Sequence, residues 1–163
     1  MQFLRPALLL VLLAGELLSG CSGSAGNSNA DNVNAANSAS VAQTGPKDNI
    51  DELSLLVRLP FEPEEVAWEE MPEQKRLIAV VRFSPENAQK MAAEIAKNGR
   101  PSPETVTVES WYPNELIAQG ELTGESTVKG QSYPAEPFLN PPYTKGKITR
   151  IHDTDYFILQ ISS

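Results

Sequence analysis

The composition of the chain changes near residue 48, and this change decides which residues can build a hydrophobic core. Residues 22–47 are nearly all Ser, Asn, Ala, Gly and Asp, with Val33 and Val41 as the only branched apolar residues. Such a segment buries too little surface to offset its ordering entropy, so we expect a flexible tether that spans about 28 Å. Aromatic and branched residues occur throughout residues 48–163, which predicts a single globular domain there.

The residues before the tether have the order of an export signal. A short start with one positive charge, Arg5, precedes the leucine-rich run PALLLVLLAGELL, which is too short to cross a bilayer as a helix. The sequence Leu18-Ser19-Gly20-Cys21 follows this run. It resembles the lipobox of bacterial lipoproteins, and the resemblance covers about the first two dozen residues.

This resemblance implies both the processing and the location of the chain. In lipoproteins a peptidase cuts before the cysteine, the sulfur receives a diacylglycerol, and the new amine is usually acylated, for example with palmitate. The resemblance thus implies a signal peptide over residues 1–20, a lipid on Cys21 at the start of the 21–47 tether, and attachment to a membrane of the cell envelope. Ser22 resembles the outer-membrane sorting class, which implies the outer membrane, facing the periplasm, in a cell with two membranes.

The clearest element in residues 48–163 is a helix that begins after Ser84. The Ser84 hydroxyl can cap this helix, Pro85 suits its first position, and Gly99 follows its last apolar residue. One helical face carries the apolar residues Ala88, Met91, Ala92, Ile95 and Ala96.

Two shorter segments also fit a helix. Residues 50–59 fit a helix capped by Asp48 and also fit a strand, and we favour the helix. Residues 112–120 predict a short helix with Pro113 in its first turn and its end at Gly120.

The remaining apolar runs predict strands. Residues 77–83 form a continuous apolar run, which favours a central strand covered on both faces. Other strands are predicted at 65–71, 104–110, 126–133, 146–151 and 156–162. The last two flank the turn-forming HDTD, which predicts a C-terminal β-hairpin. We therefore expect an α+β domain with a mostly antiparallel sheet and one main helix packed on a face.

The residues needed for several kinds of chemistry are missing. His152 is the only histidine, no G-x-S-x-G or phosphate-binding motif occurs, and Cys21 is the only cysteine, so we expect no catalytic site, metal or cofactor. The net charge of −8 makes nucleic acid an unfavourable partner. The glutamates of residues 62–73 are expected to form a solvated acidic edge that discourages strand aggregation.

Aromatic residues beside prolines are the candidates for ligand binding. We expect irregular segments around Trp111, Tyr112, Tyr133 and Tyr143, where flat rings suit a sugar or an extended peptide. The alternative is that these rings cover the open edge of a small core, and the dominance of large aromatic residues in the cores of small domains favours it. The sequence thus favours a non-enzymatic binding or structural module for an envelope protein or a cell-wall glycan such as peptidoglycan.

Two alternatives remain open. One is a small hydrolase that uses paired carboxylates such as Glu109 and Glu115 beside Trp111, which requires both acids to face one pocket. The other is an inhibitor or assembly factor that inserts the proline-rich loop of residues 134–142 into a partner.

Overall fold

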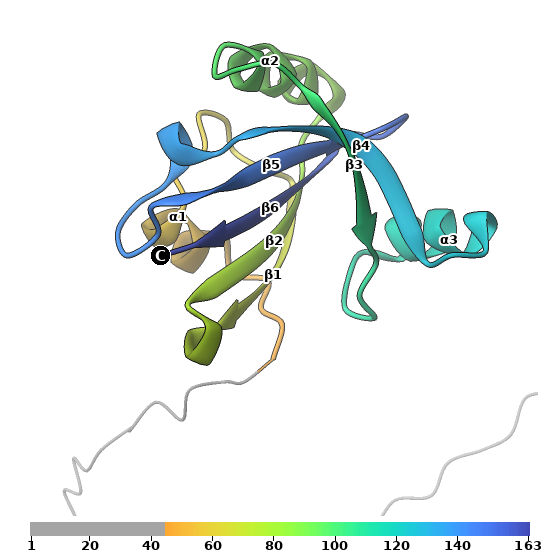
Figure 1. Ribbon diagram of the computed structural model, residues 1–163, viewed down its shortest axis with the longest axis horizontal. Coiled ribbons are helices and arrows are strands. Elements are labelled where there is room, and N and C mark those ends of the chain that lie inside the picture. Colours follow the sequence, from red (N-terminus) through yellow and green to blue (C-terminus); the bar gives the residue numbers. More distant parts are fainter. Residues whose placement is uncertain (1–44) are drawn as a thin grey trace, which may run out of the picture. The chain divides into compact units, whose positions relative to one another are not determined.

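Six strands, each antiparallel to its neighbours, form one sheet in the order β1-β2-β6-β5-β4-β3 (Figure 1). This computed structural model describes residues 45–163, so the predicted signal peptide, Cys21 and most of the predicted tether lie outside the described residues. The strands are β1 (Glu65–Met71), β2 (Arg76–Arg82), β3 (Ser102–Thr107), β4 (Thr127–Pro134), β5 (Lys145–Ile151) and β6 (Tyr156–Ser162). The α+β prediction and the C-terminal hairpin of β5 and β6 are confirmed.

Strand β2 lies inside the sheet, and both of its faces are apolar. It lies between β1 and β6, and its side chains alternate between two core clusters. Leu77, Ala79 and Val81 belong to the first cluster, whereas Val80 belongs to the second. The continuous apolar run therefore places hydrophobic cores on both faces of the sheet, as predicted.

The first face of the sheet is covered by two helices. Helix α2 (Pro85–Ala96) is capped by Ser84, whose Oγ accepts a hydrogen bond of 3.3 Å from the Asn87 amide. It buries Ala88, Met91 and Ile95, while the predicted face member Ala96 is exposed because the helix ends there.

Helix α1 (Ile50–Leu56) confirms the helical interpretation of its segment but corrects the cap. Asn49, and not Asp48, is the capping residue, because its Oδ1 accepts a hydrogen bond of 3.1 Å from the Glu52 amide. Leu53 and Val57 join the first core cluster.

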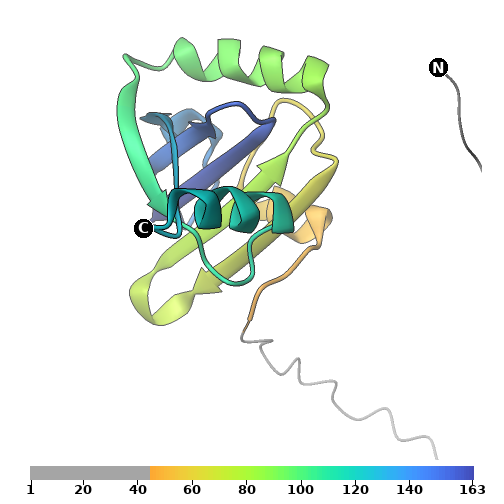
Figure 2. The ribbon, with the colours of Figure 1, turned by 90° about the vertical axis from the view of Figure 1, so that its right-hand side faces the viewer.

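Helix α3 (Asn114–Thr123) packs on the second face (Figure 2). The predicted end at Gly120 is wrong, since the helix continues to Thr123 and Gly124 closes it with a left-handed φ of 71°. Gly120 is instead buried, and a Cβ there would lie 3.1 Å from Cγ2 of Val108. Glycine at position 120 therefore allows close packing and does not end the helix.

The proline-rich loop after β4 is part of the core. It contains a short 3-10 helix, η2 (Glu136–Phe138), and buries Ala135, Phe138 and Leu139. Leu139 also forms an antiparallel bridge with Val57. This burial argues against the alternative in which the loop inserts into a partner.

The acidic segment forms an edge of the sheet, as predicted. Strand β1 is terminal in the sheet order and is followed by the 3-10 helix η1 (Pro72–Gln74). Among residues 45–163, its outer side is paired only at one point, where Lys47 and Trp68 exchange backbone hydrogen bonds of 2.7 and 2.8 Å. Lys47 Nζ also lies 4.5 Å above the Trp68 ring. The start of the described chain is thus held against β1.

Candidate functional site

The largest of the cavities described here lies at the tip of the β5–β6 hairpin, and we call it the hairpin cavity. It has a volume of about 540 Å³. Its lining consists mainly of polar side chains from β4, β5 and the connecting turn: Gln131, Tyr133, Arg150, Ile151, His152, Asp153, Thr154 and Asp155.

Strand pairing brings the polar residues of this cavity together. Gln131 of β4 and Arg150 of β5 are register partners, so their side chains lie on the same face of the sheet. Tyr133 lies two residues further along β4 and shares that face, whereas His152 is the first residue after β5. Ile151 alternates to the other face, where it is fully buried in the second core cluster.

The hairpin turn is fixed by local hydrogen bonds. Thr154 Oγ1 donates to the Ile151 carbonyl at 3.2 Å and accepts from the Tyr156 amide at 3.1 Å. Asp153 has a left-handed φ of 59°, which aspartate tolerates better than most residues. The His152 amide donates to the Lys129 carbonyl at 3.0 Å and continues the pairing with β4. The rim of the cavity is therefore well defined.

The side chains in the hairpin cavity have unused hydrogen-bonding capacity. Within residues 45–163, the side chains of Gln131, Arg150 and Asp155 make no hydrogen bond or ion pair, and the Tyr133 hydroxyl has no partner. Arg150 and Gln131 are nonetheless partly buried. The Arg150 guanidinium, the Gln131 amide and carboxylates thus surround the partly buried Tyr133 ring. These groups do not form hydrogen bonds with one another.

This set of groups suits a polyhydroxylated ligand. A guanidinium offers donors in a fixed fork, a carboxylate accepts two hydrogen bonds, and an amide does both. A tyrosine ring adds a flat apolar face. The part of the chain that the structure describes contains no group of three or more His, Cys, Asp or Glu residues that could hold a metal ion.

Of the four aromatic residues predicted to bind a ligand, the structure places only Tyr133 in the hairpin cavity. Trp111 and Tyr112 contact each other edge to face, with ring centroids 4.6 Å apart, on the α3 side of the sheet. Tyr112 and Tyr143 are 3% and 4% exposed and belong to opposite core clusters. The four rings therefore do not form one surface.

Sequence reasoning missed Gln131 and Arg150. Both occur as ordinary polar positions in predicted strands, and nothing local distinguishes them from a solvated strand face. Only the pairing of β4 with β5 makes them neighbours. The alternation of polar and apolar residues in the two segments is visible in the sequence. It would have placed Gln131 beside Arg150 only if the pairing register of β4 with β5 had been known.

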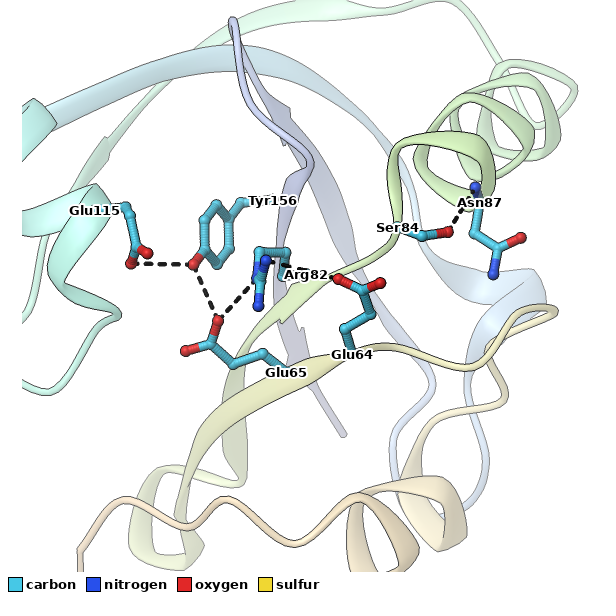
Figure 3. Close-up of polar contacts among 7 residues, drawn as sticks. All are labelled: Glu64, Glu65, Arg82, Ser84, Asn87, Glu115 and Tyr156. Atoms are coloured by element: carbon cyan, nitrogen blue, oxygen red, sulfur yellow. Dashed lines mark hydrogen bonds and ion pairs between the residues drawn. The ribbon is translucent and has the colours of Figure 1, made fainter.

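A second polar cluster joins α3 to the sheet (Figure 3). The Tyr156 hydroxyl lies 3.1 Å from Oε2 of Glu65 and 3.2 Å from Oε2 of Glu115. Arg82 Nε donates to the same Glu65 oxygen at 2.9 Å, and its Nη1 lies 3.6 Å from Glu64. Tyr156 is 4% exposed, and burial together with the hydrogen bond to Glu65 raises its pKa well above the usual value.

This cluster has the character of a structural contact. The tyrosine hydroxyl occupies the space between the two carboxylates, where a hydrolase would need to place its substrate. Glu115 and Glu109, the pair considered from sequence, line none of the cavities described. Glu109 instead lies near buried Tyr112, whose pKa is raised mainly by burial and further by the Glu109 charge.

Comparison with known proteins gives no relative from which a function could be transferred. No protein-family model, no curated protein and no solved structure matches the chain. Within residues 45–163, no helix has the length and apolar character needed to span a membrane.

Proposed function

We propose that the chain is a lipid-anchored protein of the bacterial cell envelope, and that its domain binds a cell-wall glycan in the hairpin cavity without acting as an enzyme. The anchoring rests on the resemblance of Leu18-Ser19-Gly20-Cys21 to a lipobox after an apolar export signal. The binding rests on the unpaired polar side chains around Tyr133.

The size and shape of the hairpin cavity favour a glycan over a protein partner. Small-ligand sites occupy about 300–1,000 Å³, and this cavity of about 540 Å³ lies in that range. Vicinal sugar hydroxyls fit planar groups such as those of Arg150, Gln131 and Asp155, and the apolar face of a sugar ring fits the Tyr133 ring.

The binding proposal is tested by sedimentation of the purified full-length protein, in detergent, with isolated peptidoglycan. We expect the wild-type protein to sediment with the glycan and Arg150→Gln to weaken binding about tenfold, because a charge-assisted donor is lost. Arg58→Gln is the matched control, since Arg58 is an exposed arginine outside the cavity. Trp111→Ala is expected to leave binding unchanged. Equal retention of Arg150→Gln and Arg58→Gln, or no sedimentation of the wild-type protein, would contradict the proposal.

The anchoring proposal is tested separately. We expect mass spectrometry of the mature protein to find Cys21 at the N-terminus with a diacylglycerol on its sulfur and an acylated amine. Cys21→Ser is expected to move the protein from the membrane fraction to the soluble fraction. An unmodified thiol on a membrane-bound wild-type chain would contradict lipid anchoring, and it would leave the glycan proposal standing.

A further inference from the structure

The face of the sheet that carries α3 is only partly covered by that helix. α3 packs over an apolar region that includes Val106, Val128 and Ile158, and the β1–β2 hairpin extends past it in Figure 2. Beyond this region the same face becomes polar, and two cavities of about 350 and 320 Å³ lie there. We call these two cavities together the open-face groove.

The two cavities share part of their lining on β5. The first is lined by Arg76, Gly146, Lys147, Gln160, Ile161 and Ser162, and the second by Arg100, Ser102, Glu104, Ser132, Tyr133, Pro134, Glu136, Gly146 and Lys147. Gly146 and Lys147 belong to both. The groove therefore extends from β2 across β6, β5 and β4 to β3, a span of about 19 Å at the usual strand spacing.

The strand register places the polar side chains of the groove on one face. Arg76 pairs with Ser162, and Lys147 pairs with Gln160 on the neighbouring strand. At the far edge, Ser102 of β3 pairs with Ser132 of β4. On the strands, the polar side chains of the groove come from alternate residues whose positions are fixed by backbone pairing, whereas Arg100 and Glu136 lie outside the strands.

Cations lie along this groove although the chain as a whole is acidic, with a net charge of −8. Within residues 45–163, the guanidinium groups of Arg76 and Arg100 make no hydrogen bond or ion pair. Lys147, between them, lies 2.7 Å from Glu104 Oε2. Some basic side chains elsewhere in the domain pair with glutamates, as in Arg82 with Glu65, and others, such as Arg150, form no ion pair within residues 45–163. The two unpaired arginines therefore leave positive charge available at both ends of the groove.

The neutral side chains that line the groove also have unused hydrogen-bonding capacity. The side chains of Ser132, Gln160 and Ser162 make no hydrogen bond within residues 45–163. The groove therefore combines separated cations with neutral donors and acceptors, and few of these are satisfied within the domain.

We propose that the open-face groove binds an acidic polysaccharide, with its carboxylates near Arg76 and Arg100 and its hydroxyls on the serine and glutamine side chains. An extended ligand is favoured because one small anion cannot span both cavities. A ligand with widely spaced negative charges is favoured because Glu104 and Glu136 also line the groove. These glutamates would repel a densely charged polyanion such as a nucleic acid. This site uses different arginines from the hairpin cavity, and Tyr133 lines both.

The test is calorimetric titration of the purified full-length protein, in detergent, with two oligosaccharides of equal length. Hexasaccharides of hyaluronan, with a carboxylate on every second sugar, and of chitin, which is neutral, serve as the probes. We expect hyaluronan to bind more tightly than chitin, and added salt to weaken hyaluronan binding. Arg76→Gln and Arg100→Gln are each expected to weaken hyaluronan binding about tenfold.

Matched variants separate this site from the hairpin cavity and from a change in folding. Arg150→Gln and Arg58→Gln are expected to leave hyaluronan affinity unchanged, and Arg76→Lys to retain part of it, because the charge remains while the planar fork is lost. The proposal is overturned if hyaluronan does not bind, if Arg76→Gln and Arg100→Gln bind it as the wild-type protein does, or if Arg150→Gln loses its binding. Failure of peptidoglycan sedimentation alone would leave this result unaffected.

Discussion

A single buried hydroxyl links α3 to three strands of the sheet. Tyr156 on β6 meets Glu115 of α3 and Glu65 of β1, and Glu65 in turn binds Arg82 of β2. A phenol carries one proton, so it can donate to only one carboxylate at a time. The neutral, protonated tyrosine is the form that this environment stabilises, because a phenolate would face two negative groups in a buried position.

Three buried tyrosines predict a loss of stability at high pH. Burial is the largest cause of the raised pKa of Tyr112, Tyr143 and Tyr156, and Glu70 adds to it at Tyr143. A raised pKa in the folded state means that this stability is fully present below the unfolded value near 10 and declines as pH rises above it. Each tyrosine contributes a decline of at most about 1.4 kcal/mol per pH unit.

Urea unfolding at several pH values between about 8.5 and 11.5 measures this effect. We expect the free energy of unfolding to fall above about pH 10, and Tyr156→Phe to reduce the slope of that fall. Tyr133→Phe is the control, since the Tyr133 hydroxyl has no partner within residues 45–163. Tyrosinate absorbance from all tyrosines of the folded protein near pH 10 would contradict the raised pKa values of Tyr112, Tyr143 and Tyr156.

At the scale of the elements, the pairing of β4 with β5 depends on a glycine whose role is not evident from its neighbours in the sequence. A Cβ at Gly130 would lie against the Arg150 carbonyl and 2.8 Å from Cγ2 of Thr149. Because the obstacle includes backbone, Gly130→Ala is expected to lower the free energy of unfolding by about 2–3 kcal/mol. Gly124→Ala meets no neighbour within 4 Å and is expected to cost about 1 kcal/mol for its left-handed φ alone.

Urea denaturation of the two glycine variants gives the comparison. The larger loss should occur at Gly130, where the strands pair closely beside the hairpin cavity. Equal losses at the two positions would show that close approach of β4 and β5 does not constrain residue 130.

Elements whose causes are local could be predicted from sequence. Helix α2 is specified by Ser84, Pro85 and its apolar face, and β2 by its continuous apolar run. Gly120 misled the prediction because its reason is contact with Val108, a neighbour that only the folded structure supplies. The same limit applies to Gln131 and Arg150, since the β4–β5 register decides that they meet.

The burial of aromatic side chains was harder to predict from the sequence than the helices and strands. Trp111 and Tyr112 lie beside Pro113, and Tyr143 follows Pro142, so their segments were expected to be irregular and to present binding rings. In the structure Tyr112 and Tyr143 are core residues of opposite faces, which is the alternative that the sequence left open. Burial of a loop aromatic depends on what the loop packs against, and composition does not contain that information.

At the scale of the whole molecule, the two proposed sites are lined by different arginines and share Tyr133. The hairpin cavity lies at the β5–β6 tip and is lined by Arg150, whereas the open-face groove is lined by Arg76, Lys147 and Arg100. Core clusters pack on both faces of the sheet. With the lipid anchor proposed on Cys21, such a domain would bind glycans from a membrane-linked position.

The most direct test of the central claim is nuclear magnetic resonance of isotope-labelled protein during titration with a peptidoglycan disaccharide. We predict that the largest chemical-shift changes occur at Gln131, Tyr133 and Arg150, and that they saturate. We also predict that Arg150→Gln requires about tenfold more disaccharide to reach the same changes, while Arg58→Gln titrates as the wild-type protein does. Saturating changes confined to other residues, or none at all, would contradict a glycan site in the hairpin cavity.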